Sequence, residues 1–532
     1  MVALPPSPEP GTQKEETAMF YPTKAEIERL GRQRPDVFKS WWAEVGFAFS
    51  LLASTLMAEY FVSGFNILLP VLSEALDIPP ESRTWPASVF SLVTGALLLP
   101  FGRLIDMYGA NVVFISGLVW FAIWSLVAGF SRNAMMLIVC RALQGFGPAA
   151  FLPSGIMLIG TIYRPGPRKN MVFSLYGAFA PIGFFSGIFV GGISGEILAW
   201  NWYFWIGTIL LFIVSVVAFA TVPSLPSNAQ GSHKPKMDFW GALTIVSGLV
   251  LVIFAITDSS HAPKGWSTPY IYITFCLGAL SLGGAVYIEG WVADDPLLPF
   301  DLFQVQYMKP LVVSLFFGYG VFGIFLFYAS FYIETVLSVS PLLTTAWFAP
   351  MVAGGLILST VGGFTLHLLP GKIVLIISSL GYLTCVLLFA LIPENPNYWA
   401  YIFPSMLCAT LGVDVTYSVS NVFITTSLPK HRQGLAGALI NSILFLGISF
   451  FLGIADLVVA KTESSGTRGS YKAAFWFAVA CAAVGLILVV GFVDVGKASS
   501  DLTVEEKAGL EAELAERENH KATGTVVSQT PP

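Results

Sequence analysis

A charged and an amide side chain lie inside one long apolar stretch of the sequence. Arg141 and Gln144 stand three residues apart in RALQGFGPAA, with apolar residues before and after them. This spacing places both side chains on one face of a helix. A charge at the centre of a bilayer-spanning helix costs about 2.5–3.5 kcal/mol on insertion scales, so such an arginine has a partner or faces a water-filled cavity. The alternative is a helix-end arginine that reaches the lipid headgroups.

Two carboxyl groups occupy comparable positions. Glu59 lies midway along an apolar stretch, in STLMAEYFVSGFN, and Asp414 lies in LGVDVTYSVSN. An isolated carboxyl group in a low-dielectric environment can take up and release a proton near physiological pH. Both are therefore candidates for carrying protons. The alternatives are that Asp414 pairs with a neighbouring helix and that Glu59 makes a structural hydrogen bond.

The composition indicates what kind of protein positions these groups. The chain has 532 residues, of which 55% are hydrophobic and 11% are charged, whereas soluble domains carry about 25% charged residues. Many apolar stretches reach the roughly 18 residues needed to cross a bilayer. We therefore expect an all-α polytopic membrane protein embedded in the lipid bilayer. The net charge of -5 and the lack of a basic tract speak against nucleic-acid binding.

Hydropathy predicts fourteen membrane spans. We expect them at 45–72, 85–102, 111–130, 134–161, 170–194, 201–222, 239–257, 268–288, 310–334, 341–362, 371–392, 398–427, 434–460 and 471–493. Similar sequences, YRPGPRKNMVFSLYGA and LPKHRQGLAGALINS, precede the fifth and thirteenth spans. Parallel repeats of six spans build paired-bundle transporters, so two of the central spans form an insertion.

These expectations give five regions. They are a disordered cytosolic tail at 1–44, a six-helix bundle at 45–222, a linker with two inserted helices at 223–308, a second six-helix bundle at 309–493, and a cytosolic tail with a short helix at 494–532. The short helix is predicted from a capping box that pairs Thr503 with Glu506.

Loop charges predict the orientation. An even number of spans places both termini on one side of the membrane, and cytosolic loops carry more Lys and Arg. Ten basic residues fall in loops on the side of the termini: Arg103, Arg164, Arg168, Lys169, Lys234, Lys236, Lys309, Lys372, Lys430 and Arg432. Five fall on the opposite side: Arg83, Arg132, Lys264, Lys461 and Arg468. Both termini are thus expected in the cytosol.

Two glycine-containing motifs join or build the spans. In GRLIDMYGANV, Gly102 and Gly109 permit a tight turn, and Arg103 and Asp106 are spaced for an i,i+3 pair. The fifth span carries glycines at four-residue spacing, a pattern that lets two helices approach closely. These are Gly183, Gly187, Gly191 and Gly195, with Gly192 beside them. Ordinary helix packing is the favoured interpretation of this glycine face taken alone.

Taken in order, these stretches resemble the signature motifs of the major facilitator superfamily. GRLIDMYG resembles the loop motif G-x-L-x-D-x-x-G, and RALQGFGPA, which includes Gly145 and Gly147, matches R-x-x-Q-G-x-G-x-A. GFFSGIFVGG resembles the antiporter motif G-x-x-x-G-P-x-x-G-G, with Ile188 in place of proline. The loop motif also lacks its usual basic residues, having Met107, Ala110 and Asn111 there. Fourteen spans make the fungal drug:proton antiporters the most similar branch. GVDVTYS and PKHRQGLAGALINS are similar to its aminotriazole-resistance-like members.

The resemblance implies a fold of two six-helix bundles with two inserted central helices, and a central cavity lined by spans 1, 4, 9 and 12. Glu59, Arg141 and Asp414 would then face one another across it. Polar residues on the same spans are candidates for contact with substrate, with core packing as the alternative for each. They are Asn66, Tyr319, Tyr328, Tyr417 and Asn421. Glu334, Asp258, Glu289 and Asp456 lie near span ends and are expected at the membrane interface.

The predicted function is proton-coupled transport by alternating access, with export of a small organic compound or toxic solute. An uptake permease or facilitator on the same fold is the first alternative, because the motif proline is missing. A non-transporting receptor or sensor is the second. The chain has no P-loop, no G-x-S-x-G turn and no metal-ligand spacing among its five histidines, which speaks against an enzyme, a cofactor or a bound metal. The expected partners are protons and a small-molecule substrate. A monomer is expected, in the plasma membrane in preference to the vacuolar membrane.

Overall fold

The computed structural model is all-helical in the residues that it describes, which are 32–79, 82–164, 167–224, 236–293, 295–365, 369–427 and 433–496. Fourteen helical segments in this part of the chain are long and apolar enough to cross a membrane, as predicted. The principal helices are α2 (Trp41–Ala75), α3 (Trp85–Tyr108), α4 (Ala110–Ala128), α5 (Ala134–Gln144), α6 (Phe146–Ile162), α7 (Pro167–Glu196), α8 (Asn201–Thr221), α9 (Phe239–Asp258), α10 (Pro269–Tyr287), α11 (Met308–Phe331), α12 (Pro341–Thr365), α13 (Gly371–Ala390), α14 (Phe403–Ser427), α15 (Gln433–Lys461) and α16 (Gly466–Phe492).

Short side chains mark where several helices begin. Ser40, Asn133 and Asp238 each accept a hydrogen bond from a backbone N–H three residues later, at 3.1, 2.8 and 2.8 Å. Such caps satisfy donors that have no partner within the helix. Between α3 and α4, Gly109 has φ +92, a conformation that glycine adopts without steric cost. One residue is therefore enough to reverse the chain there.

Six helices on either side of the inserted pair pack in the same pattern. In the first half, α2 packs on α7 and α8, and α4 packs on α6 and α8. In the second half, α11 packs on α15 and α16, and α13 packs on α14 and α16. The two sets of contacts correspond helix by helix, because α11 to α16 repeat the order of the first six spans. This is the two-bundle arrangement expected for a paired-repeat transporter.

The two halves meet along two pairs of helices. We call them the α3–α15 seam and the α7–α12 seam after the helices that pack there. The number of spans is even, so the beginning of α2 and the end of α16 lie at one end of the bundle. We call this the termini end and the opposite one the far end. Both seams reach the far end, where Ser88 faces Ser449 and Gly195 faces Pro341.

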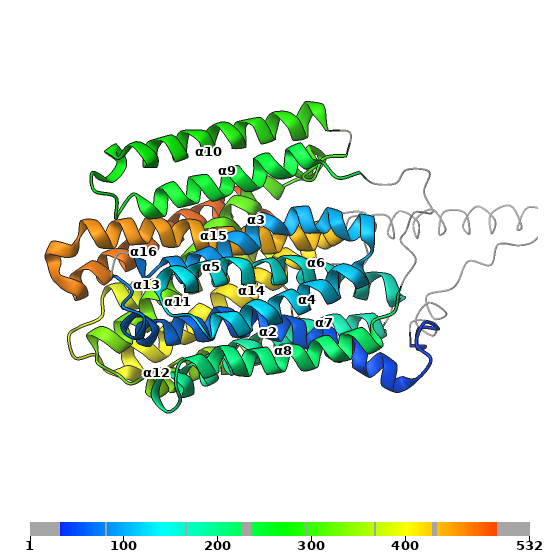
Figure 1. The fold of residues 1–532 in the computed structure, drawn as a ribbon, viewed down its shortest axis with the longest axis horizontal. Coiled ribbons are helices and arrows are strands. Elements are labelled where there is room, and N and C mark those ends of the chain that lie inside the picture. The colour runs from blue at the N-terminus through cyan, green and yellow to red at the C-terminus, as the bar shows by residue number, and fades with distance from the viewer. Residues whose placement is uncertain are drawn as a thin grey trace, which may run out of the picture.

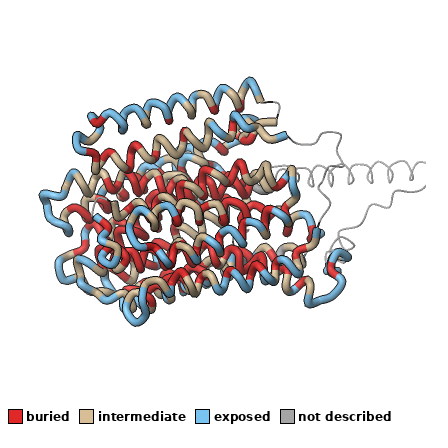
Figure 2. The backbone as a smooth tube through the Cα atoms, in the orientation of Figure 1, coloured by how far each residue is buried: buried red, intermediate tan, exposed pale blue. Residues whose placement is uncertain are grey.

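The inserted helices α9 and α10 lie along one flank of the molecule. In Figure 1 they are the two green helices at the top, with α9 between α10 and the bundle. α9 packs on α10, α3 and α15, while Figure 2 shows α10 largely exposed or half-buried. The buried residues concentrate in the middle of the two bundles (Figure 2). The inserted pair is therefore an addition to the outside of the α3–α15 seam.

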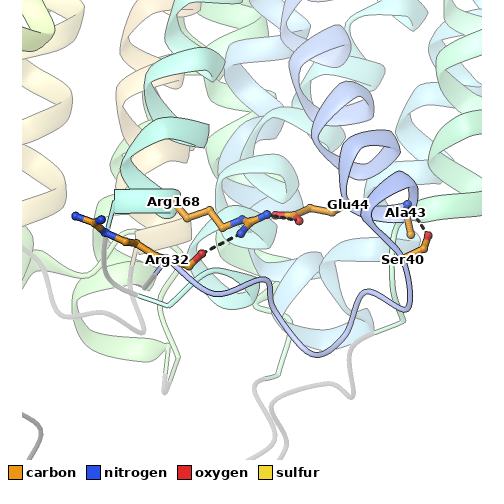
Figure 3. Close-up of polar contacts among 5 residues, drawn as sticks. All are labelled: Arg32, Ser40, Ala43, Glu44 and Arg168. Atoms are coloured by element: carbon orange, nitrogen blue, oxygen red, sulfur yellow. Dashed lines mark hydrogen bonds and ion pairs between the residues drawn. The ribbon is translucent and has the colours of Figure 1, made fainter. Parts of the chain in front are cut away.

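At the termini end, an ion pair ties α2 to α7. Arg168 donates from Nε and Nη2 to the two carboxylate oxygens of Glu44, each at 2.7 Å, and from Nη1 to the Arg32 carbonyl oxygen at 3.0 Å (Figure 3). Both Glu44 oxygens are engaged in a fork, the strongest geometry for this pair. Phe38 is buried against Phe47, with ring centroids 5.1 Å apart.

The predicted span limits hold to within a few residues at most positions. α2 begins at Trp41, four residues earlier than expected, and the last span begins at Glu463 where 471 was expected. A 3-10 turn, Glu463–Ser465, leads into α16 there. The short helix predicted from Thr503 and Glu506 lies outside the described residues, as does most of the tail expected at 1–44.

Candidate functional site

Arg141 is one of the most completely buried side chains in the described part of the protein, with 1% of its surface exposed. Its Nε donates to the Pro86 carbonyl oxygen at 3.1 Å, and its Nη2 donates to the Phe61 carbonyl oxygen at 3.2 Å. Its Nη1 donates to Gln144 Oε1 at 3.1 Å. The prediction that Arg141 and Gln144 share a helix face is thus confirmed. The arginine fastens α5 to both α2 and α3.

Aromatic rings complete the surroundings of this guanidinium. Its carbon atom lies 4.0 Å from the ring centroid of Phe65 and 4.3 Å from that of Phe90. Such cation–π contacts are strongest where water is excluded. Gln144 in turn donates from Nε2 to Ser125 Oγ at 3.0 Å. The charge is held by carbonyl oxygens, an amide and two rings, and it is not a snorkelling helix-end arginine.

The helix of the span that carries Arg141 is interrupted shortly after that residue. α5 ends at Gln144 and α6 begins at Phe146, so the helix is interrupted at Gly145. A Cβ atom at Gly145 would lie 2.9 Å from the Phe90 carbonyl oxygen, and Thr94 Oγ1 donates to the Gly145 carbonyl oxygen at 3.1 Å. Only glycine permits this close approach to α3. Gly145 therefore allows the span that carries Arg141 to lie directly against α3.

Glu59 and Asp414, on opposite halves of the protein, lie within electrostatic range of each other. Glu59 lies midway along α2 and Asp414 midway along α14, and their charges are close enough to interact. Thr410 Oγ1 donates to Asp414 Oδ2 at 2.7 Å. A Cβ atom at Gly355 of α12 would lie 2.8 Å from the same oxygen and 3.3 Å from Pro181 Cβ of α7. The two carboxyl groups therefore lie where the halves meet.

Hydroxyl and amide groups surround these carboxyl groups. Tyr176 and Tyr417 both lie within electrostatic range of Glu59, and Tyr176 faces Thr55. Tyr417 faces Asn441 of α15. Glu59, Asp414 and Tyr417 are only partly buried, whereas Tyr176 is 7% exposed. We call Glu59, Asp414, Tyr176 and Tyr417 the central carboxylate cluster; it is polar and partly accessible in the middle of an apolar protein.

The structure places the predicted substrate contacts at different sites. Asn66 and Arg141 line one small cavity between α2, α3, α5, α11 and α15. Tyr319 is fully buried and faces Ser420 and Tyr417. Asn421 lies on α14, one turn after Tyr417. Tyr328 lies elsewhere, because its ring packs on Tyr471 at 5.5 Å.

Arg141 was predicted to face Glu59 and Asp414 across the central cavity. Glu59 and Asp414 lie within electrostatic range of each other, while the hydrogen-bond acceptors of Arg141 are carbonyl and amide oxygens. Sequence reasoning missed Tyr176, Thr55 and Asn441. Thr55 lies four residues before Glu59 on the same helix face, and this spacing could have identified it. Tyr176 and Asn441 lie on the fifth and thirteenth spans, which were not among those expected to line the cavity.

The loop motif connects the first half to the inserted helices. Arg103, spaced to pair with Asp106, donates from Nη2 to the carbonyl oxygens of Asp295 and Pro296, at 2.6 and 3.1 Å. These residues follow the π-helical turn Ile288–Val292 that extends α10. The motif arginine of this chain thus holds the segment that leads out of the inserted pair.

The glycines of the fifth span face two different helices. A Cβ atom at Gly187 would lie 2.5 Å from the Tyr60 carbonyl oxygen, and one at Gly191 would lie 2.6 Å from the Gly64 carbonyl oxygen, both in α2. Gly183 lies against Leu56 of the same helix. Gly192 instead faces Thr345 of α12. The structure therefore shows close helix packing at these glycines, which was the favoured interpretation of the glycine face.

Two acidic residues expected at the membrane interface are buried. Asp456 is 6% exposed and Glu289 is 7% exposed. Asp456 Oδ2 lies 2.7 Å from His261 Nε2, and Glu289 Oε2 accepts from the Leu298 backbone N–H at 3.0 Å. A neighbouring loop therefore covers each side chain, so these two carboxyl groups are enclosed by protein. No cluster of three or more metal-ligating side chains occurs among the described residues.

Comparison with known proteins identifies the family. Residues 51–452 match the model of the Major Facilitator Superfamily. The chain is 34% identical over 419 residues to a low affinity ammonium transporter of Saccharomyces cerevisiae, covering 77% of this chain and 80% of that one. It is 32% identical over 475 residues to the efflux pump terJ of Aspergillus terreus, covering 87% and 90%.

The aminotriazole resistance protein of Saccharomyces cerevisiae is 30% identical over 476 residues, covering 87% of each chain, which agrees with the likeness seen in GVDVTYS and PKHRQGLAGALINS. Among solved structures, the human organic anion transporter MFSD10 superposes with a TM-score of 0.56 at 15% identity and covers 84% of this chain and 98% of its own. At that identity the likeness concerns the fold alone. The family is one of transporters, not enzymes. With fourteen helical spans, its signature motifs and these relatives, the chain belongs to the major facilitator superfamily as an integral membrane secondary transporter of small molecules.

Proposed function

We propose that this transporter exchanges protons for a small organic compound or toxic solute, and that it works as an exporter. The observation that carries the proposal is the central carboxylate cluster, in which Glu59 of the first half and Asp414 of the second lie within electrostatic range of each other. Both carboxyl groups are partly accessible in an otherwise apolar region. Ionisable groups inside membrane spans mark ion pathways and proton relays. Export is supported by the relatives named as efflux pumps and resistance proteins.

In the proposed cycle, a carboxyl group of the cluster accepts a proton while the cavity is open to the outside. The proton is released after the halves have rocked and the cavity is open to the inside, and the substrate moves the other way. Glu59 and Asp414 belong to different halves, so their mutual repulsion depends on protonation and on how the halves are arranged. Protonating one of them removes a like-charge repulsion.

We also propose how the protein sits in the cell. The excess of basic residues in loops on the termini side supports cytosolic termini. The units 45–222 and 309–493 would move as two bodies, with 223–308 carrying the inserted pair. The plasma membrane is proposed over the vacuolar membrane because an exporter of toxic solutes discharges them outside the cell. The transporter is proposed to act as a monomer, since the cluster is complete within one chain.

The test is substrate-driven proton flux in proteoliposomes, comparing wild type with Glu59→Gln and Asp414→Asn. The panel contains ammonium, aminotriazole and a set of toxic organic compounds of both charges. We expect an imposed pH gradient to drive movement of at least one compound, and at least one of the two variants to abolish the pH-driven component. Asn441→Asp is a comparison variant. It adds a carboxyl group near Tyr417 and so changes the charge of the central carboxylate cluster while Glu59 and Asp414 are kept.

The alternative of an uptake permease or facilitator has its own outcome in this assay. Movement that persists without a gradient, unchanged in both carboxyl variants, would identify a facilitator and refute proton coupling. Coupled flux in which substrate and proton move in the same direction would identify an uptake permease. Ile188, which stands where the antiporter motif has proline, is the observation that favours testing this alternative.

A further inference from the structure

The inserted helix α9 lies across the seam along which the two halves separate. It packs on α3 of the first half and on α15 of the second. The Phe254 ring lies 5.5 Å from the Trp85 ring at the start of α3, and Thr257 lies against Gly453 of α15. In alternating access the halves rock about a central site. α9 therefore cannot remain fixed to both helices at an end that opens.

At the far end, the loop after α9 is bound to the second half through a buried contact. His261 Nε2 lies 2.7 Å from Asp456 Oδ2, and Ser260 Oγ donates to the same oxygen at 3.3 Å. The side chains of His261 and Asp456 are 13% and 8% exposed. A buried carboxylate is strongly destabilised when its partner is removed. The loop thus holds α15 by a contact that is costly to break.

Other polar groups from three elements face this carboxylate. Thr84, which precedes α3 in the first half, lies toward Asp456. Tyr328 of α11 and Tyr471 of α16 lie within electrostatic range of it, and Arg83 faces Tyr471. Asp456 is therefore the point at which the first half, the second half and the inserted pair meet at the far end.

At the termini end, the inserted pair is bound to the other half. Arg103 near the end of α3 donates to the carbonyl oxygens of Asp295 and Pro296, which follow α10. The pair is thus held by the first half at one end and by Asp456 of the second half at the other. Separation of α3 from α15 at the far end must therefore break the contact of the inserted pair with one of the two halves.

We propose that His261 and Asp456 form a latch through which the α9–α10 pair holds the far end of the α3–α15 seam closed, and that this latch opens whenever the far end opens. The proposal gives the inserted helices a role in transport that is separate from proton binding at Glu59 and Asp414. It rests on membership of a transporter family and on these contacts. It does not depend on the direction of transport or on proton coupling.

The test is the rate at which a cysteine in the seam reacts with a hydrophilic maleimide in purified, detergent-solubilised protein. The five native cysteines are first replaced by alanine or serine. Ser88→Cys reports on the far end, because Ser88 is fully buried against Ser449, and Ala438→Cys reports on the termini end, where Ala438 faces Gly102. We expect His261→Ala and Asp456→Asn each to raise labelling at position 88 about ten-fold or more, with no rise at position 438.

Two controls separate a latch from general loosening. Tyr270→Phe removes a 2.7 Å hydrogen bond to Asp258 that lies wholly within the inserted pair, and it should leave both labelling rates unchanged. The exchange His261→Asp with Asp456→His restores the contact in reverse and should bring labelling at 88 back toward the starting rate. His261 lies in a loop, so His261→Ala remains informative if Asp456→Asn fails to fold.

The proposal is overturned if labelling at 88 stays at the wild-type rate in His261→Ala. It is also overturned if Tyr270→Phe raises the rate as much, or if positions 88 and 438 rise together, since either result describes general loosening. These readouts need no substrate. Failure of the latch and failure of proton coupling in proteoliposomes are therefore separate results.

Discussion

Arg141 shows how a charge is kept in the interior of a membrane protein without a carboxylate beside it. Three of its nitrogen atoms donate to oxygens on three helices, and two rings cover the guanidinium. The carbonyl and amide oxygens and the two rings together compensate the charge, and none of these partners is Glu59 or Asp414. Arg141 is therefore best understood as the residue that fixes the relative positions of α2, α3 and α5.

The planar fork of the guanidinium is what this role requires, and it leads to a first prediction. Arg141→Lys keeps the charge but cannot reach the Phe61 and Pro86 carbonyl oxygens together with Gln144. We expect a loss of about 1.5–3 kcal/mol, the range for hydrogen bonds to charged groups, measured by thermal unfolding of the purified protein. Arg132→Lys, at an exposed loop position, is the control. Equal stability of the two variants would contradict the positioning role.

For single residues, the sequence predicts which polar side chains are buried better than it predicts the groups that they contact. The position of Arg141 in an apolar stretch was enough to predict a buried charge with partners, since such charges are rare. Its partners at Phe61 and Pro86 are backbone atoms, which every residue supplies, so no side-chain pattern indicates them. Tyr176 was missed for a related reason, because a tyrosine in a membrane span is also an ordinary packing residue.

Among the helices, α2 and α7 show how closely two elements can pack within one half. Gly183, Gly187 and Gly191 present no side chain to α2, and the Gly64 and Tyr60 backbones occupy the space. Small residues at four-residue spacing permit this approach, and in lipid it is van der Waals packing that holds such helices together. The four-residue pattern predicted the contact, while its partner helix became known only from the fold.

A second prediction tests this contact. Gly191→Ala would place a methyl group 2.6 Å from the Gly64 carbonyl oxygen, and a backbone atom cannot give way as a flexible side chain can. We expect a destabilisation of about 1–3 kcal/mol, as for overpacked interiors, measured as a lower unfolding temperature in detergent. Gly177→Ala on the same helix is the matched control, because a Cβ atom there meets nothing within 4 Å. Alanine favours the helix at both positions, so a similar loss in both variants would show that the effect is not specific to the contact with Gly64 and would refute the packing argument.

Element positions along the sequence were predicted well, and their environments less well. Runs of apolar residues report the length of a span directly, which is why all fourteen spans were found and most of their limits lie within a few residues of those expected. Asp456 and Glu289 were expected at the membrane interface because they lie near span ends. Whether a span end is exposed depends on the loop that covers it, and the loop carrying His261 comes from a helix nearly 200 residues earlier in the chain.

The whole molecule is organised by its internal repeat. Equivalent helices of the two halves make equivalent contacts, and the halves meet at two seams related in the same way. Weakly similar sequences before the fifth and thirteenth spans indicated this repeat, since α7 and α15 are the corresponding helices. The seams themselves could not be predicted from sequence, because they join residues far apart in the chain: Ser88 and Ser449 are 361 positions apart, and Ile188 and Thr345 are 157 positions apart.

A third prediction follows from the far end of the α3–α15 seam. Ser88 Oγ and Ser449 Oγ are 2.8 Å apart and both side chains are fully buried, so a pair of cysteines there is placed to form a disulfide. In a cysteine-free background, oxidation of Ser88→Cys/Ser449→Cys should abolish transport, because the halves can no longer separate at that end, and reduction should restore it. The measurement is flux in the proteoliposome assay.

The matched control is Ser247→Cys/Ser281→Cys, which joins α9 to α10 where their hydroxyl oxygens are 2.9 Å apart. This disulfide lies within the inserted pair and should leave flux unchanged whether oxidised or reduced. Undiminished flux with the seam disulfide fully formed would mean that the halves do not separate along α3 and α15.

The position of the inserted pair also determines how a compound dissolved in the lipid could reach the centre of the protein. On the flank shown at the top of Figure 1, α9 and α10 stand between the surrounding acyl chains and the α3–α15 seam. Within the described residues, no corresponding pair of helices covers the α7–α12 seam. Lateral access from the bilayer is therefore blocked on the flank that carries α9 and α10. A hydrophobic compound would have to enter between α7 and α12 or through the water-facing opening.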